Sequence, residues 1–174
     1  MILGMSVATF TLLHVIISLI AIAAGIVTVI GMVKGKQLAG WTGVFLWTTV
    51  LTSVTGFFFP FVKVGPPHIF GVISLLVLAP AMAGLYRYQL AGGWRWAYVV
   101  GSIFALYLNC VVLIVQSFQK IPFLNQLAPT QSSEPPFAAA QGLLLVLTVV
   151  AGVLSIRHFH TASGAMPRRA AGAA

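Results

Sequence analysis

Residues 6–33 read SVATFTLLHVIISLIAIAAGIVTVIGMV, a stretch that is almost wholly apolar and contains no charged side chain. A helix needs about 20 apolar residues to cross the hydrocarbon core of a bilayer, so this stretch can span it with some tilt. Its continuous apolar character favours a helix over a strand of a membrane barrel. No Lys or Arg precedes it, and it continues about ten residues beyond the cleavage-like sequence Ala21-Ile22-Ala23. We therefore interpret it as a retained helix rather than a cleaved signal peptide.

The rest of the chain repeats this pattern between short polar breaks. Of its 174 residues, 60% are hydrophobic and only 6% are charged, whereas soluble domains are about a quarter charged. We therefore predict an all-α membrane protein, a five-transmembrane-helix bundle within residues 1–160. The predicted helices cover residues 6–33, 41–61, 67–86, 96–118 and 137–156. Residues 161–174 have no apolar period and are predicted to form a disordered cytoplasmic tail.

The basic residues predict the orientation of the chain in the bacterial inner membrane. If five helices alternate, most Lys and Arg residues fall on one side, which the positive-inside rule assigns to the cytoplasm. These residues are Lys34, Lys36, Arg87, Arg95, Arg157, Arg168 and Arg169. Lys63 and Lys120 fall on the other side, so the N-terminus is expected outside and the C-terminus in the cytoplasm. Because the basic residues occur singly or in pairs, they form no patch for phosphates, and nucleic acid is not an expected partner.

A short repeat suggests that four of the helices form two similar hairpins. The letters QLAG occur at residues 37–40 and 89–92, each time just before a tryptophan. Farther upstream, Ile-Ser-Leu occurs at residues 17–19 and 73–75. Parallel repeats related by an axis along the membrane normal are a known solution in membrane proteins. We predict two repeated helical hairpins plus a fifth helix.

This alignment places His14 and His68 at similar depth near the outer face. Neutral imidazole is the commonest metal ligand and can hold haem iron from both sides. The pair resembles in outline the histidines of four-helix membrane cytochromes of the b type, so haem b is the cofactor that the sequence suggests. The alternative is that both histidines are polar packing or interfacial groups.

Further polar residues accompany the two histidines. Asn109, Gln116 and Lys120 recur at spacings that place them on one face of the predicted helix 96–118 and its outer end. Glu134, the single acidic residue, precedes the last helix. Polar groups in lipid turn inward, so they are expected either to bond between helices or to form an outward-facing pocket for a quinone headgroup, a small solute or an ion.

Catalytic motifs are missing from the sequence. There is no Ser-His-Asp set, no carboxylate pair, no phosphate-binding loop and no Cys/His spacing typical of zinc, so hydrolase and nucleotide chemistry are not expected. Two stretches of sequence resemble those of small bacterial inner-membrane proteins with no assigned activity. They are GWTGVFLWTTVLTSVTGFFFPF (residues 40–61) and LAPTQSSEPPF (residues 127–137). That resemblance implies location alone.

Three functions remain open at this stage. The first is a non-enzymatic accessory or subunit protein with a polar outward-facing site between its helices, whose partners are the lipid bilayer and either other membrane subunits or a second copy. The second is an electron-transfer protein that binds haem b through His14 and His68, with a quinone near Gln116 and Lys120. The third is a transporter of a small solute or ion. Whether a metal is bound cannot be read from the sequence.

Overall fold

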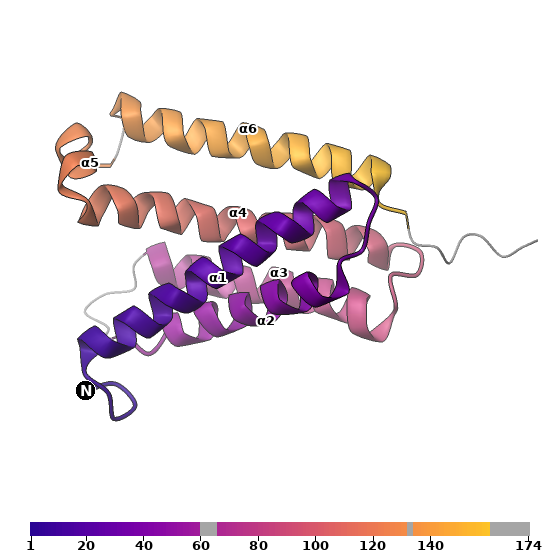
Figure 1. Cartoon of the computed structure of the whole chain (residues 1–174), viewed down its shortest axis with the longest axis horizontal. Coiled ribbons are helices and arrows are strands. Elements are labelled where there is room, and N and C mark those ends of the chain that lie inside the picture. Colours follow the sequence, from indigo (N-terminus) through magenta and orange to yellow (C-terminus); the bar gives the residue numbers. More distant parts are fainter. Residues whose placement is uncertain (60–65, 132–133, 161–174) are drawn as a thin grey trace, which may run out of the picture.

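The computed structural model describes residues 1–59, 66–131 and 134–160, and in this part of the chain the elements are helices. Only an isolated bridge between Ile2 and Met5 pairs backbone in the manner of a strand there. The helices lie roughly side by side along the long axis of the molecule (Figure 1). Their bounds are α1 Val7–Val33, α2 Ala39–Gly56, α3 Pro66–Met82, the π-helix η1 Ala83–Arg87, α4 Trp94–Lys120, α5 Pro122–Leu127 and α6 Pro135–His158.

Local chemistry explains where the first helix begins and ends. Ser6 is the N-cap of α1, and its side chain accepts a hydrogen bond from the backbone N–H of Thr9 at 3.1 Å. A serine oxygen there satisfies an N–H that has no partner within the helix. At the other end, Gly35 adopts a φ of +67°, a left-handed conformation that costs glycine little and stops the helix. The sequence between these signals is mostly apolar and contains no proline, so the helix is uninterrupted.

Four helices in the described ranges are long and apolar enough to cross a membrane: α1, His68–Arg87, α4 and α6. The second predicted span, residues 41–61, corresponds to α2, which has 18 residues and ends at Gly56. Threonine and serine recur along α2 and reduce its apolar character, which explains why it is not among the four. A bundle of five spanning helices therefore stays a prediction.

One further difference concerns a connection. The loop between the predicted fourth and fifth spans is not entirely irregular, because it contains the short helix α5, which starts with Pro122 at its first turn. Proline suits that position since its missing N–H would have no partner within the helix. The predicted tail, residues 161–174, and Lys63 lie outside the described residues.

Four of the helices pack as neighbours in two pairs, and α6 lies alongside them. α1 contacts α2 along its length, α3 contacts α4, and α6 lies against α4 and α1. Figure 1 shows α1 crossing α4 and α6 obliquely, with α5 at one end of the bundle. We call this the α5 end and the opposite end the Arg95 end. The pairing matches the expected hairpins, while the duplication that the repeat suggests remains untested.

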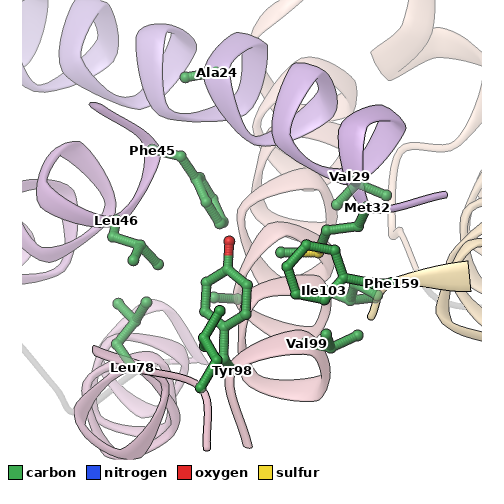
Figure 2. Close-up of a cluster of buried hydrophobic side chains, with 12 residues drawn as sticks. Ala24, Val29, Met32, Phe45, Leu46, Leu78, Tyr98, Val99, Ile103 and Phe159 are labelled. Atoms are coloured by element: carbon green, nitrogen blue, oxygen red, sulfur yellow. The ribbon is translucent and has the colours of Figure 1, made fainter. Parts of the chain in front are cut away.

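Towards the Arg95 end, the interior is filled by a cluster of buried side chains, which we call the packed half. Its members shown in Figure 2 include Met32 of α1, Phe45 of α2, and Tyr98 and Ile103 of α4. Helices approach closely here because glycines leave room: a Cβ at Gly101 would lie 2.9 Å from the Ala81 Cβ. Such contacts between small residues are typical of helices packed in membranes.

Candidate functional site: a cavity at the α5 end

Towards the α5 end, the same four helices enclose a cavity of about 630 Å³, which we call the hollow half of the bundle. Its wall comes from the first half of α1, the end of α2, the first half of α3 and the last half of α4. This volume lies within the range of pockets that hold small molecules and cofactors. The polar residues of the wall are Thr11, His14, Ser18, Thr52, Ser53, His68, Ser74, Asn109, Gln116, Ser117 and Lys120.

Five of the six residues singled out in the sequence line this one cavity. His14 comes from α1, His68 from the first turn of α3, and Asn109, Gln116 and Lys120 from one stripe of α4. The helical period puts the α4 residues on a common face, and the antiparallel pairing brings that face against α1 and α3.

Glu134, the sixth, is not among the described residues that line the cavity. It occupies the N-cap position of α6. Its Oε1 accepts a hydrogen bond from the backbone N–H of Thr130 at 2.9 Å and another from the Thr130 hydroxyl. An acid at this position interacts favourably with the helix N-terminus. Its role in the structure is thus to order the α5–α6 connection.

The imidazole of His14 is held by a hydrogen bond to α2. Its Nδ1 lies 2.8 Å from the hydroxyl oxygen of Thr55. That hydroxyl also lies 2.7 Å from the carbonyl oxygen of Leu51, to which it can only donate. Because the Thr55 proton is used there, its oxygen accepts from His14, so Nδ1 carries the imidazole proton. The neutral ring then presents the lone pair of Nε2, which can bind a metal or accept a hydrogen bond.

Aromatic rings surround both histidines. The Phe59 ring meets the His14 ring edge to face, with centroids 5.2 Å apart. The Phe57 ring lies 6.3 Å from the His68 ring. All four residues line the cavity. Its mouth is therefore aromatic as well as polar, a combination that suits flat, partly polar ligands.

Two hydroxyl groups of the wall have no hydrogen-bond partner among the residues that the structure describes. They are the side chains of Thr52 on α2 and Ser74 on α3, and Ser74 is only 3% exposed. The serine of the other Ile-Ser-Leu copy differs, since the Ser18 hydroxyl donates to the His14 carbonyl at 2.7 Å. A buried hydroxyl without a partner costs about 1–3 kcal/mol. Both hydroxyl oxygens are covered by neighbouring atoms, so each would pair with a polar atom in the cavity after its side chain turned towards that atom.

The floor of the cavity is formed by Asn109 and Leu108 of α4. The Asn109 amide donates to the hydroxyl of Thr49 at 3.2 Å, and Thr49 is fully buried. Below this bond lie the aromatic and aliphatic side chains of the packed half. The cavity is thus closed towards the Arg95 end and reaches the exposed Lys120 at the α5 end.

The residues of the wall limit the chemistry that is available. Within the described ranges, no group of three or more His, Cys, Asp or Glu side chains is positioned to hold a metal ion. The wall can instead orient a ligand by hydrogen bonds, because it carries two imidazoles, two amides, several hydroxyls and one ammonium group.

Sequence reasoning did not pair Thr55 with His14, and it did not single out Ser74 as a site residue. The Thr55 hydroxyl could not be distinguished from the neighbouring threonines on its face of α2, because only the three-dimensional packing shows that it meets His14. A signal for Ser74 was present, since both Ile-Ser-Leu copies place their serine on the cavity wall.

Comparison with known proteins adds no further information about this cavity. No protein-family model matches the chain, and no curated protein or solved structure matches it significantly.

Proposed function

We propose that this chain is a small integral membrane protein of the bacterial inner membrane that binds an amphipathic small molecule in the cavity of its hollow half. The observation that carries the proposal is the cavity itself, about 630 Å³ in volume, with polar groups from four helices on its wall and a packed floor. A pocket closed at one end supports a binding or accessory role more than passage of a solute across the membrane.

The basic residues support an orientation with the cavity on the outer side. Among the described residues, Lys34, Lys36, Arg87, Arg95 and Arg157 lie at helix ends at the Arg95 end. The end of α1, the start of α4 and the end of α6 meet there, since the His158 imidazole contacts the Val33 carbonyl at 3.1 Å and Arg95 donates to the carbonyl of Phe159. By the positive-inside rule, this end faces the cytoplasm. The α5 end and the mouth of the cavity then face outward.

The shape of the wall between α1 and α4 favours the proposal that the ligand is amphipathic rather than water-soluble. The two helices touch at Gly25, where a Cβ would lie 2.8 Å from Leu106, and they diverge towards the α5 end (Figure 1). Leu19 and Leu113, which line the cavity on these diverging halves, are also exposed on the outer surface. An apolar tail can leave the cavity there and continue among the lipid chains.

The experiment compares what the purified protein retains from the membrane. The full chain is extracted in mild detergent, and organic extracts are analysed by mass spectrometry. Val112→Trp fills the cavity, whereas Leu145→Trp changes an exposed residue of α6 and serves as the matched control. We expect a stoichiometric amphiphile from the wild type and from Leu145→Trp that is depleted at least tenfold from Val112→Trp. Equal extracts from all three proteins would contradict the proposal.

Haem b is a second candidate ligand for the same cavity, favoured by the state of His14. A metal-ligating histidine almost always donates its other ring N–H to a fixed acceptor, and His14 donates Nδ1–H to Thr55. His68 on the same wall would be the second axial ligand. The test is the visible absorption spectrum of the purified protein with and without dithionite. A Soret band lost in His14→Ala and in His68→Ala would support haem, and a colourless protein would exclude it.

A further inference from the structure

The register of the helices places the hydrogen-bonding groups of the cavity at two depths. His14 lies level with the end of α2, since it bonds to Thr55 and its Cε1 is 3.8 Å from where a Gly56 Cβ would be. Gly71 of α3 is level with Phe57, whose ring would lie 3.1 Å from its Cβ. Ser74 is one helical turn farther along α3, and Thr52 is about one turn back along α2. The two unpartnered hydroxyls therefore lie about one turn, ~5.4 Å, deeper than His14.

The two levels offer complementary chemistry. At the upper level, Nε2 of His14 has a lone pair and no proton, so it accepts a hydrogen bond. At the lower level, Ser74 carries an O–H without an acceptor, and the small serine side chain can turn between its staggered positions to present it. A matching ligand has a hydrogen-bond donor at one end of a short rigid group and a hydrogen-bond acceptor at the other end.

From this pattern we infer that the amphipathic ligand is a lipid-soluble para-quinol. Its two ring oxygens are about one helical turn apart. One hydroxyl would donate to His14 Nε2, the opposite oxygen would accept from Ser74, and the aromatic mouth residues Phe57 and Phe59 would flank the ring. The isoprenoid tail would leave between Leu19 and Leu113. This inference rests on the proposed function, and it concerns binding alone.

The test measures how tightly the full chain binds two probes. The chain is placed in nanodiscs of synthetic phosphatidylcholine, which contain no quinone. The probes are decylubiquinol and its dimethyl ether, which keeps the ring and the tail but has no hydroxyl to donate. We expect the wild type to bind the quinol at least tenfold more tightly than the ether. His14→Phe should abolish this preference. If His14→Phe does not fold, Thr55→Val takes its place. It keeps the imidazole but removes the acceptor that fixes its tautomer, so it should reduce the preference severalfold.

Ser74→Ala tests the deeper level. Losing one hydrogen bond to the ligand should weaken quinol binding about fivefold to tenfold. Ser102→Ala is the matched control, because the Ser102 hydroxyl is also buried without a partner in the described structure but lies outside the cavity wall. It should bind like the wild type.

The outcomes separate this inference from the proposed function. Equal affinity for quinol and ether, or equal effects of Ser74→Ala and Ser102→Ala, would overturn the quinol inference. If extracts still show an amphiphile that depends on an open cavity, the proposed function stands and only the ligand class is wrong. If Val112→Trp changes neither the extract nor quinol affinity, both fail.

Discussion

Polar side chains have different surroundings in the packed half and in the hollow half of the bundle. In the packed half, the hydroxyls of Thr42 and Tyr98 lie 3.2 Å apart, and both residues are almost completely buried. Large side chains fill the remaining space around them. In the hollow half, polar residues of four helices surround open volume. The same helices therefore build a rigid base at one end and a binding chamber at the other.

Unpartnered hydroxyls alone do not distinguish the two halves. Ser102 and Ser155 in the packed half lack hydrogen-bond partners in the described structure, as Ser74 and Thr52 do in the hollow half. The difference is that Ser74 and Thr52 line the cavity of the hollow half, whereas Ser102 and Ser155 are not part of its wall. A ligand can satisfy a hydroxyl only where there is space for the ligand, so the comparison teaches that space and polarity must coincide to mark a site.

The largest expected effect contrasts glycines of the two halves. Gly101→Val should destabilise the protein by about 3 kcal/mol, because its Cβ alone would lie 2.9 Å from the Ala81 Cβ and 3.1 Å from the Val77 carbonyl oxygen. Gly56→Ala in the hollow half meets His14 at an ordinary 3.8 Å and should change stability by less than about 1 kcal/mol. The single cysteine, Cys110, is partly buried, so a thiol-reactive dye can follow thermal unfolding. Similar melting temperatures for both variants would contradict the contrast.

A smaller effect is expected from the buried hydroxyl pair of the packed half. Tyr98→Phe removes the partner of the Thr42 hydroxyl and should lower the free energy of unfolding by about 1 kcal/mol. Ligand retention should be unchanged, because neither residue lines the cavity. The same thiol-dye assay measures stability, and extraction measures the ligand. Loss of the ligand in Tyr98→Phe would show that the two halves are coupled.

The sequence predicted much of this architecture because a membrane imposes simple rules. Long apolar stretches such as residues 7–33 must form helices, since lipid cannot satisfy free backbone groups. The period of α4 likewise placed Asn109, Gln116 and Lys120 on one wall. The hydrogen bonds could not be predicted in this way. Nothing local to Thr55 shows that it meets His14, and nothing in the two Ile-Ser-Leu copies shows that Ser18 has a partner whereas Ser74 has none among the described residues. The sequence placed Glu134 before the last helix, where it is the N-cap of α6, but it could not show that Glu134 is absent from the cavity wall in the described structure.

The smallest expected effect is a change in stability caused by Ser74→Ala, whose sign should depend on whether a ligand is bound. Ser74→Ala removes a buried hydroxyl that has no partner in the described structure, so it should raise the stability of the ligand-free protein by up to about 1 kcal/mol. Thr49→Val should do the opposite, because it leaves the Asn109 amide without its acceptor at the cavity floor. With saturating quinol, the stabilising effect of Ser74→Ala should reverse, since the bound state then loses a hydrogen bond. Thermal unfolding in quinone-free nanodiscs, with and without decylubiquinol, measures both signs. A destabilising effect of equal size in both conditions would mean that the Ser74 hydroxyl already has a partner in the protein, and the hollow half would then differ from the packed half in volume alone.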